Sequence, residues 1–188
     1  MQQSYDVLFA SSNKHKYQEA RIILAKFGIK LGFFNCKLLE IQSDFIKKIA
    51  LHKVTDAFNQ CKKPVIVEDD GLFINLLGGF PGPFSSYAFK TIGNNGILQL
   101  VNTKRGANFQ SVIAYCDKKQ VALFDAKVKG KISKKIHGKG WGYDPIFIPQ
   151  GEKKTYALLK NKNEISHRYL ALRKFSNWFV YRQKSTYR

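Results

Sequence analysis

The first third of the chain alternates between short apolar runs and helical patterns, and this alternation restricts the fold more than any other feature. Residues 5–10 (YDVLFA) have a strand-like pattern, and a polar Ser-Ser-Asn turn leads into a helical pattern over residues 14–27. A second helical pattern covers residues 43–61, and residues 64–67 (PVIV) follow as a short buried strand. Strand, helix, helix and strand in this order predict an α/β fold.

Apolar residues recur at helical spacing in both patterns. On the first helix they are Ala20, Ile23, Leu24 and Phe27, and on the second they are Phe45, Ile46, Ile49, Ala50, Val54, Ala57, Phe58 and Cys61. Further along the chain, residues 111–115 and 121–132 are strand candidates, and an amphipathic helix begins at about Ser166. No repeat or linker divides the chain, so we expect one domain over residues 1–188, with a basic C-terminal tail at about residues 181–188.

Composition narrows the class of protein. The 188 residues include 32 Lys and Arg against 13 Asp and Glu, a net charge of +19 that would attract any polyanion. The basic residues are scattered over the whole chain, however, which is also typical of a solvated basic surface. Neither a run long enough for a membrane helix nor a signal-peptide pattern occurs, so we expect a cytoplasmic protein without a membrane partner. Three widely spaced cysteines indicate reduced thiols rather than disulfides or zinc ligands.

Ser11, Ser12 and Asn13 stand between the first strand and the first helix. Hydroxyls, an amide and backbone N–H groups at a helix N-terminus make an anion site, and Lys16 lies one turn into the helix. The same residues are also ordinary helix-capping residues. Neither a P-loop nor a dinucleotide fingerprint is present. Phosphate binding would therefore use another design.

Glu68, Asp69 and Asp70 directly follow the apolar run of residues 64–67. Ligands of open α/β sheets gather at the carboxyl ends of strands, so we expect these acids to face a cleft. Adjacent carboxylates suit Mg²⁺, and one of them can deprotonate an attacking water. An isolated Glu-Asp-Asp-Gly run is also common in turns. Glu40 supplies a further acid before the second helix, and cations for phosphate oxygens occur at Lys16, Lys53, Lys162 and Arg168.

Several long motifs occur together and in order. They are FASSNKHK, LEIQ, VIVEDDGLFINLLGGFPGPFSSY, GKGWGYDPIFIPQGEKKTYALL and KNEISHRYLAL. Over nearly the whole chain they resemble the inosine/xanthosine triphosphate pyrophosphatases, and archaeal-type members most of all. The resemblance implies a two-lobed α/β fold with an elongated mixed central sheet, flanking helices and a deep cleft. It also implies a homodimer that needs Mg²⁺, releases pyrophosphate from non-standard purine triphosphates (ITP, dITP, XTP) and requires no nucleic acid.

The resemblance assigns a role to each motif residue. Asp69 is implied as the catalytic base, and the implied metal ligands are Glu40, Glu68 and Asp69. The positions implied at the triphosphate are Ser11, Ser12, Asn13, Lys16, Lys53 and Asp70. The positions implied at the base are Trp141, Gly142, Tyr143, Asp144, Lys162, His167 and Arg168. An aromatic ring can stack on a purine, and Lys or Arg can donate to the 6-keto oxygen where adenine carries an amino group.

Three residues depart from the family pattern. Ser12 replaces a glycine, and Trp141 replaces a smaller aromatic residue that can also stack. Asp70 replaces a Ser or Thr that could donate to a phosphate. A carboxylate at this position would repel a phosphate unless it turns away, is protonated or gains a second cation. We therefore expect altered substrate binding or metal use without loss of the general base.

Two other functions remain compatible with parts of the sequence. A relative of the septum-formation-inhibitor nucleotide pyrophosphatases would share the architecture and act on modified pyrimidine nucleotides, although the intact Ser-His-Arg and Gly-Trp-Gly-Tyr-Asp-Pro stretches argue against it. A non-enzymatic nucleic-acid-binding protein would explain the charge of +19 but not the carboxylates.

Overall fold

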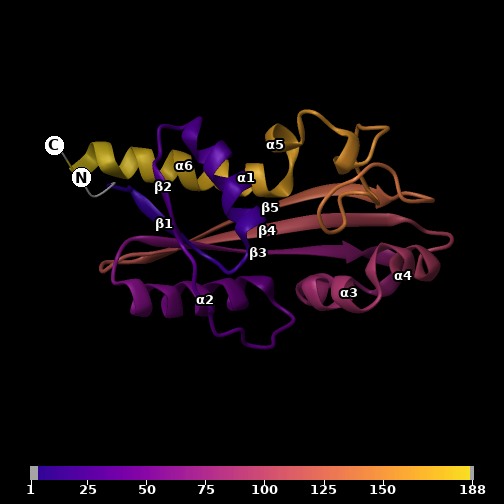
Figure 1. The fold of residues 1–188 in the computed structure, drawn as a ribbon, viewed down its shortest axis with the longest axis horizontal. Coiled ribbons are helices and arrows are strands. Elements are labelled where there is room, and N and C mark those ends of the chain that lie inside the picture. The colour runs from indigo at the N-terminus through magenta and orange to yellow at the C-terminus, as the bar shows by residue number, and fades with distance from the viewer. Residues whose placement is uncertain (1–3, 187–188) are drawn as a thin grey trace. The chain divides into compact units, whose positions relative to one another are not determined.

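A computed structural model describes the backbone of residues 4–186 and the side chains of residues 4–184. Within this range a single sheet has the strand order β2-β1-β3-β4-β5-β6 (Figure 1). The strands are β1 (Val7–Ala10), β2 (Leu31–Phe34), β3 (Val65–Ile74), β4 (Gly106–Cys116), β5 (Val121–Ile132) and β6 (Phe147–Pro149). β1 pairs in parallel with β2 and β3, and β5 pairs antiparallel with β6. The sheet is mixed, which confirms the predicted α/β fold class.

Helices account for most of the remaining chain. The α-helices are α1 (Lys14–Ala25), α2 (Ile46–Cys61), α3 (Ser85–Thr91), α4 (Gly93–Leu100), α5 (Lys162–Ile165) and α6 (His167–Thr186). Short 3₁₀ turns are η1 (Asn75–Leu77), η2 (Gly82–Phe84) and η3 (Tyr156–Leu158). The chain divides into two compact units. The described part of the first unit comprises residues 4–69, 112–126 and 168–186, and the second unit comprises residues 70–111 and 127–167.

In the first unit, helices cover both faces of the sheet (Figure 1). One core lies between the sheet and helices α1 and α6, with Phe9, Ile66 and Phe175 fully buried in it. The other core lies under α2, where Ala50 and Val54 pack against the opposite face. The predicted apolar face of α2 is therefore confirmed for most positions, but Phe45 precedes the helix and is 64% exposed.

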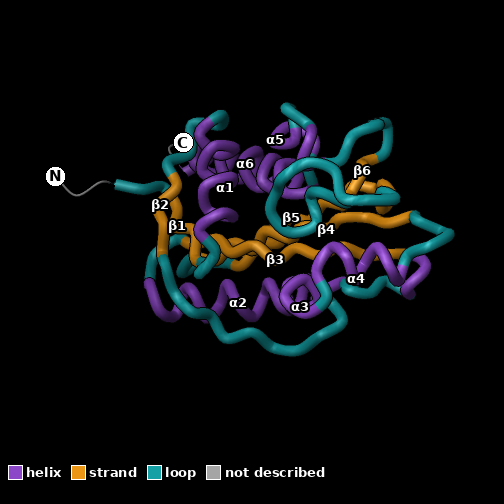
Figure 2. Tube along the Cα trace, turned by 45° about the vertical axis from the view of Figure 1, so that its right-hand side comes forward, coloured by secondary structure: helices purple, strands orange, loops and turns teal. Residues whose placement is uncertain are grey.

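The second unit has its own core. It is built from β3, α4, β4 and the segment around β6, and Leu72, Ile97 and Phe147 are fully buried in it. Helices α3 and α4 follow one another along the chain beside the strands (Figure 2). The hydroxyl of Ser85, at the start of α3, accepts from the Leu72 backbone N–H at 2.8 Å and donates to the Gly82 carbonyl at 2.7 Å. The bond from Leu72 to Ser85 holds β3 in place just beyond its acidic residues.

Strand β3 and helix α6 continue well past the ends that the sequence pattern predicts. β3 does not end at Val67 but continues through the acids to Ile74, so the expectation that the acids follow the end of a strand is wrong. Helix α6 continues to Thr186, through most of the segment predicted as a tail, and residues 187–188 lie outside the described residues. In the described range no helix is both long and apolar enough to cross a membrane.

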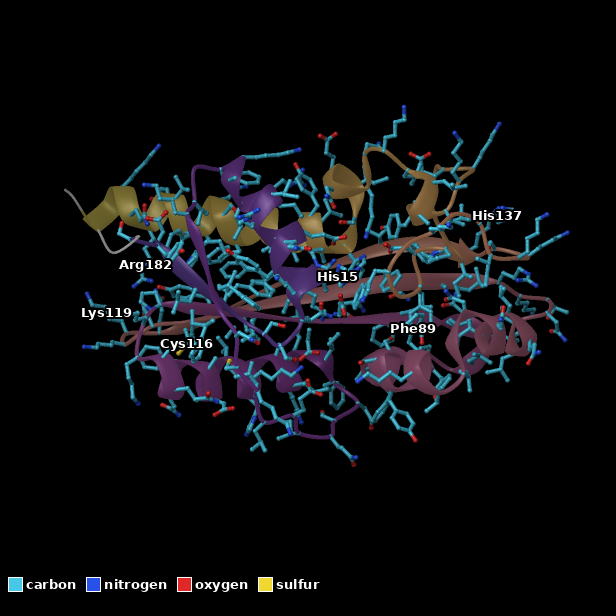
Figure 3. The ribbon with its side chains drawn as sticks, in the orientation of Figure 1. His15, Phe89, Cys116, Lys119, His137 and Arg182 are labelled. Carbon is cyan, nitrogen blue, oxygen red and sulfur yellow. The ribbon has the colours of Figure 1, made fainter. Side chains whose placement is uncertain are left out.

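The end of α6 is attached to the turn between β4 and β5 (Figure 3). Arg182 forms an ion pair with Asp117 at 2.8 Å and donates to the Tyr115 hydroxyl at 3.2 Å. The other Asp117 oxygen accepts from the backbone N–H groups of Lys119 and Gln120 and closes the turn. Cys36, Cys61 and Cys116 are free thiols, of which Cys116 is buried and the other two are partly exposed.

Candidate active site

The alternation of side chains along β3 separates its three acids. Ile66 belongs to the core under α1 and α6, whereas the valines on either side of it belong to the core under α2. Successive side chains of a strand point to opposite faces, so Glu68 and Asp70 share the face of Ile66, and Asp69 lies on the α2 face. Because Glu68 and Asp69 point in opposite directions, the geometry does not join them around one ion.

Asp69 meets a lysine from α2. The Lys53 ammonium lies 3.0 Å from Asp69 Oδ2 and 2.7 Å from Glu40 Oε1. The Lys53 and Asp69 side chains are only 11% and 14% exposed, while that of Glu40 is 70% exposed. The structure thus brings together three of the predicted residues, with one ammonium between two carboxylates.

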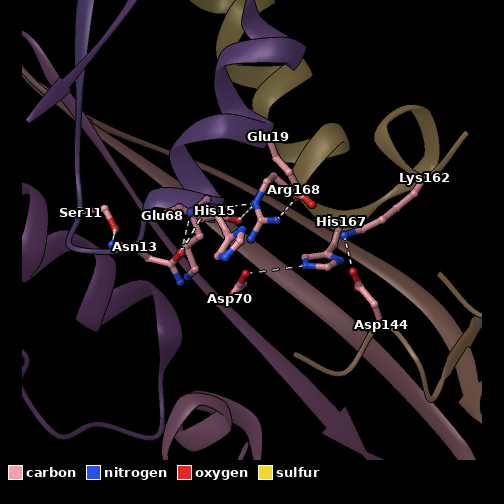
Figure 4. Close-up of polar contacts among 11 residues, drawn as sticks. Ser11, Asn13, His15, Glu19, Glu68, Asp70, Asp144, Lys162, His167 and Arg168 are labelled. Atoms are coloured by element: carbon pink, nitrogen blue, oxygen red, sulfur yellow. Dashed lines mark hydrogen bonds and ion pairs between the residues drawn. The ribbon is translucent and has the colours of Figure 1, made fainter. Parts of the chain in front are cut away.

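Glu68 meets an arginine from the start of α6 (Figure 4). Arg168 Nε donates to both Glu68 oxygens at 2.9 and 2.8 Å, and Arg168 Nη1 contacts the Glu19 carboxylate from α1. The Glu68 and Arg168 side chains are 0% and 3% exposed. Arg168, predicted at the base, is therefore held in the interior of the first unit between two carboxylates.

The Ser-Ser-Asn turn caps α1. Asn13 Oδ1 accepts from the backbone N–H groups of His15 at 3.0 Å and Lys16 at 3.3 Å, and the Asn13 backbone N–H donates to Ser11 Oγ at 2.9 Å. The capping interpretation of these residues is therefore correct. Ser12 is exposed. The Asn13 side-chain oxygen faces the helix, so the NH₂ group of the same amide is a further donor at this end of α1.

In the second unit, Asp70 faces a histidine. Asp70 Oδ2 lies 3.9 Å from His167 Nε2, and their side chains are 13% and 4% exposed. The His167 ring stacks on Phe109 with ring centroids 4.2 Å apart and an interplanar angle of 3°. The residue that departs from the family pattern thus lies beside a titratable side chain that is cationic when protonated.

Asp144 and Lys162 form a second ion pair in this unit, with 2.6 Å between Lys162 Nζ and Asp144 Oδ2. Their side chains are 10% and 14% exposed. Both residues were predicted at the base, and the structure places them in direct contact (Figure 4). The Lys162 ammonium, a group with three N–H donors, is thereby fixed in position beside Asp144.

The Gly-Trp-Gly-Tyr-Asp loop combines an exposed ring with a buried anchor. Trp141 is 41% exposed, whereas Tyr143 is 4% exposed. The Tyr143 hydroxyl donates to the Ser85 carbonyl at 3.0 Å, and burial raises the pKa of Tyr143 well above its ordinary value, so it remains a donor. The Gly142 carbonyl accepts from the Asn94 amide at 3.1 Å. Tyr143 and Gly142 therefore fix the loop, and Trp141 is its exposed ring.

The predicted site residues fall into one set in each unit. The first unit holds Ser11, Ser12, Asn13, Lys16, Glu40, Lys53, Glu68, Asp69 and Arg168. The second unit holds Asp70, Trp141, Gly142, Tyr143, Asp144, Lys162 and His167. Within residues 4–184, no group of three or more His, Cys, Asp or Glu side chains is arranged to hold a metal ion.

Comparison with known proteins identifies the family. The model of the Ham1 family matches residues 7–178. The chain belongs to the Ham1 family. It is 45% identical to a dITP/XTP pyrophosphatase of Methanopyrus kandleri over 92% of this chain and 95% of that protein. It is 41% identical to a dITP/XTP pyrophosphatase of Thermococcus kodakarensis over 90% of this chain and 95% of that protein. The solved structure of a HAM1 protein from Coxiella burnetii has a TM-score of 0.79 at 30% identity and covers 93% of this chain and 98% of that one.

Two residues that hold the site of this Ham1-family chain in place are not among the site residues predicted from the sequence. Glu19 binds Arg168, and Ser85 anchors both β3 and Tyr143 through its hydroxyl and carbonyl. Glu19 had a weak signal, because it is the single acid in helix α1 of a very basic chain. Ser85 had none, because its role depends on segments that are distant in sequence.

Proposed function

We propose that the protein hydrolyses non-standard purine nucleoside triphosphates (ITP, dITP and XTP) to the monophosphate and pyrophosphate, and so removes them from the nucleotide pool. The observation that carries the proposal is the 45% identity to a dITP/XTP pyrophosphatase over 92% of the chain. The contacts of Asp69 and Lys53 support it further, because they supply a base and a cation of the kind that phosphoanhydride hydrolysis needs.

Asp69 is the proposed general base. Its carboxylate is mostly buried and lies 3.0 Å from the Lys53 ammonium, which favours the ionised form that can accept a proton from water. The water oxygen then bonds to phosphorus as the anhydride bond between the α- and β-phosphates breaks, and the pyrophosphate leaves with the electron pair. Lys53 is also a cation for the phosphate oxygens, and Ser11, Ser12, Asn13 and Lys16 are proposed to hold the triphosphate at the start of α1.

A divalent cation fits the donor set on the α2 face of β3. Glu40 and Asp69 already hold one cationic group between them, the Lys53 ammonium, at 2.7 and 3.0 Å. Mg²⁺ in nucleotide enzymes is commonly held by one or two carboxylates together with substrate phosphates. Glu40 and Asp69 are the residues proposed to hold it, and the ion would stabilise negative charge on the phosphates. Glu68 is proposed to support the site through its bond to Arg168.

The second unit is proposed to read the base. Trp141 offers an exposed ring for stacking, and Lys162 offers N–H donors for the 6-keto oxygen of hypoxanthine or xanthine. Asp144 is proposed to hold Lys162 in place for this contact, and His167 lies beside Asp70. Because Asp70 faces His167, the proposed effect of Asp70 is on His167 and only indirectly on phosphate.

Pyrophosphate release from a panel of nucleotides tests the function. We expect kcat/KM for ITP, dITP and XTP to exceed that for ATP and GTP by on the order of 10². ATP is disfavoured because a buried donor that meets the adenine amino group stays unpaired, whereas GTP has the 6-keto oxygen and must be rejected by the pocket wall near C2, where guanine carries an amino group. ATP and GTP carry the same triphosphate and are the matched controls. Equal turnover of ATP and ITP would contradict the proposal, and preference for a modified pyrimidine nucleotide in the panel would favour the septum-formation-inhibitor type.

Stacking on Trp141 predicts a fluorescence signal that a second tryptophan controls. Trp178 packs in the core of the first unit, with its ring 5.1 Å from that of Tyr115. IMP should change the fluorescence of a Trp178→Phe protein and leave that of a Trp141→Phe protein unchanged. Trp141→Ala should also raise KM for ITP roughly tenfold, since stacking on one base contributes about 1–3 kcal/mol. An IMP signal that persists without Trp141 would rule out stacking on this ring.

We also propose that the protein forms a homodimer and lies in the cytoplasm. Large apolar side chains lie exposed between η1 and α4, and each is 36–71% exposed: Phe80, Phe84, Tyr87, Phe89 and Ile92. Exposed apolar side chains gathered in one stretch often belong to protein interfaces, which supports a second copy of the chain as the partner. The cytoplasm is proposed because the substrates belong to its nucleotide pool.

A further inference from the structure

The second unit carries an unusually basic segment over residues 127–160. It contains nine lysines: Lys127, Lys129, Lys131, Lys134, Lys135, Lys139, Lys153, Lys154 and Lys160. Every one of these nine side chains is exposed. The segment has two acids, and one of them, Asp144, is buried against Lys162. Glu152 is therefore the one acid of the segment left to balance nine exposed cations.

These lysines also lack carboxylate partners within the part of the chain that the structure describes. None of the nine forms an ion pair with a residue in the range 4–184. In the first unit, by contrast, Lys47 pairs with Asp125 at 3.0 Å, and Lys53 pairs with two acids. Cations without nearby carboxylates make the local electrostatic potential positive and draw polyanions toward the surface that carries them.

Backbone contacts hold the lysine-bearing stretches of the segment together. The Gln150 N–H donates to the Lys129 carbonyl at 2.8 Å, which ties the turn after β6 to β5. The Thr155 hydroxyl donates to the His137 carbonyl at 2.8 Å, which ties the next stretch to the loop after β5. A cavity of about 580 Å³ opens among them, and Lys129, Lys131 and Asn108 contribute to its lining. The cations are thus carried by connected elements.

We propose that this basic segment binds the phosphate backbone of double-stranded nucleic acid without sequence specificity, a property beyond the proposed hydrolysis. A duplex carries one negative charge per about 1.7 Å of its axis, against one per about 3.4 Å for each strand alone. Single-stranded binders add rows of stacking aromatic rings, and Trp141 is the one exposed aromatic ring of residues 127–160. The segment offers lysines without such a row, which fits backbone contacts to a duplex.

Two triple variants with equal charge changes test the proposal. The first is Lys129→Gln/Lys131→Gln/Lys153→Gln in the basic segment. The control is Lys63→Gln/Lys118→Gln/Lys119→Gln, three exposed lysines of the first unit that also lack ion pairs in the described range. A fluorescent 20-bp DNA duplex of arbitrary sequence is titrated with each protein from 50 to 200 mM NaCl. ITP hydrolysis and circular dichroism, which neither variant should change, verify that each protein is folded.

The salt dependence decides the outcome. Each lysine that contacts a phosphate contributes about 1 to the slope of log K against log salt, so the first variant should have a slope shallower by about 3 and weaker binding at every salt concentration. The control should keep the wild-type slope. Absence of duplex binding by the wild type at 50 mM NaCl, or equal losses in the two variants, would overturn the proposal. Tighter binding to a single strand of equal length would overturn the choice of a duplex.

Discussion

Replacing Asp69 by Asn is expected to lower kcat for ITP hydrolysis by about 10²–10⁴-fold, the range that a positioned general base contributes. The amide keeps the size of the side chain and one oxygen that can face Lys53, but it cannot take a proton from water. Steady-state pyrophosphate release with saturating ITP measures the effect. Because the fold and the Lys53 contact are retained in part, KM should change much less than kcat.

The matched control is Asp125→Asn, on β5 of the same unit. Asp125 also pairs with a lysine, Lys47, but at the surface, where the side chains are 36% and 52% exposed. This variant should keep nearly the full rate, since surface ion pairs contribute little. If the folded Asp69→Asn protein keeps more than half of the wild-type rate, Asp69 is not the base.

Replacing Arg168 by Met is expected to lower the free energy of unfolding by about 3–5 kcal/mol, because it removes the guanidinium that pairs with the fully buried Glu68 carboxylate. Urea unfolding monitored by circular dichroism gives this difference. Arg173→Met is the control on the same helix: Arg173 is exposed and lies over Tyr169, so its loss should cost about 0.5 kcal/mol or less.

A double variant separates the buried charge from the loss of packing. Glu68→Met/Arg168→Met also removes the fully buried Glu68 carboxylate. It should be more stable than Arg168→Met alone, because the carboxylate that remains, that of Glu19, is 26% exposed and keeps contact with water. If the double variant is no more stable than the single one, the cost comes from lost packing, and the buried charge is not its cause.

The sequence predicted β1, α1 and α2, but it did not predict β2, α3 or α4. The alternation in the first third matched β1, α1 and α2 to within a few residues, because amphipathic periodicity reflects the faces that become buried. The end of β3 was misjudged for a physical reason: three consecutive acids are unfavourable in a strand unless each finds a partner. Here Arg168, Lys53 and His167 supply these partners, and all three come from other elements.

The motifs marked residues that the structure places in two sets, but the contacts within each set could not be predicted from the motifs. Glu68 and Asp69 are neighbours in sequence, which suggested a shared role, but strand alternation turns them to opposite faces. Arg168 lies in the motif implied to read the base, yet its guanidinium is buried between Glu19 and Glu68. Such pairings depend on which helix covers which face of the sheet, and a single sequence does not carry that information.

The position of the acids inside β3 also determines which length changes the protein can tolerate. Loops commonly accept an added or deleted residue, but a strand held by neighbours on both edges keeps its register. One residue inserted between Val67 and Glu68 would turn every following side chain to the opposite face, so that Glu68 would take the place of Asp69 and Asp69 that of Asp70. Gene variants that differ by one codon here should therefore be absent among active enzymes, even where single substitutions at the same positions are accepted.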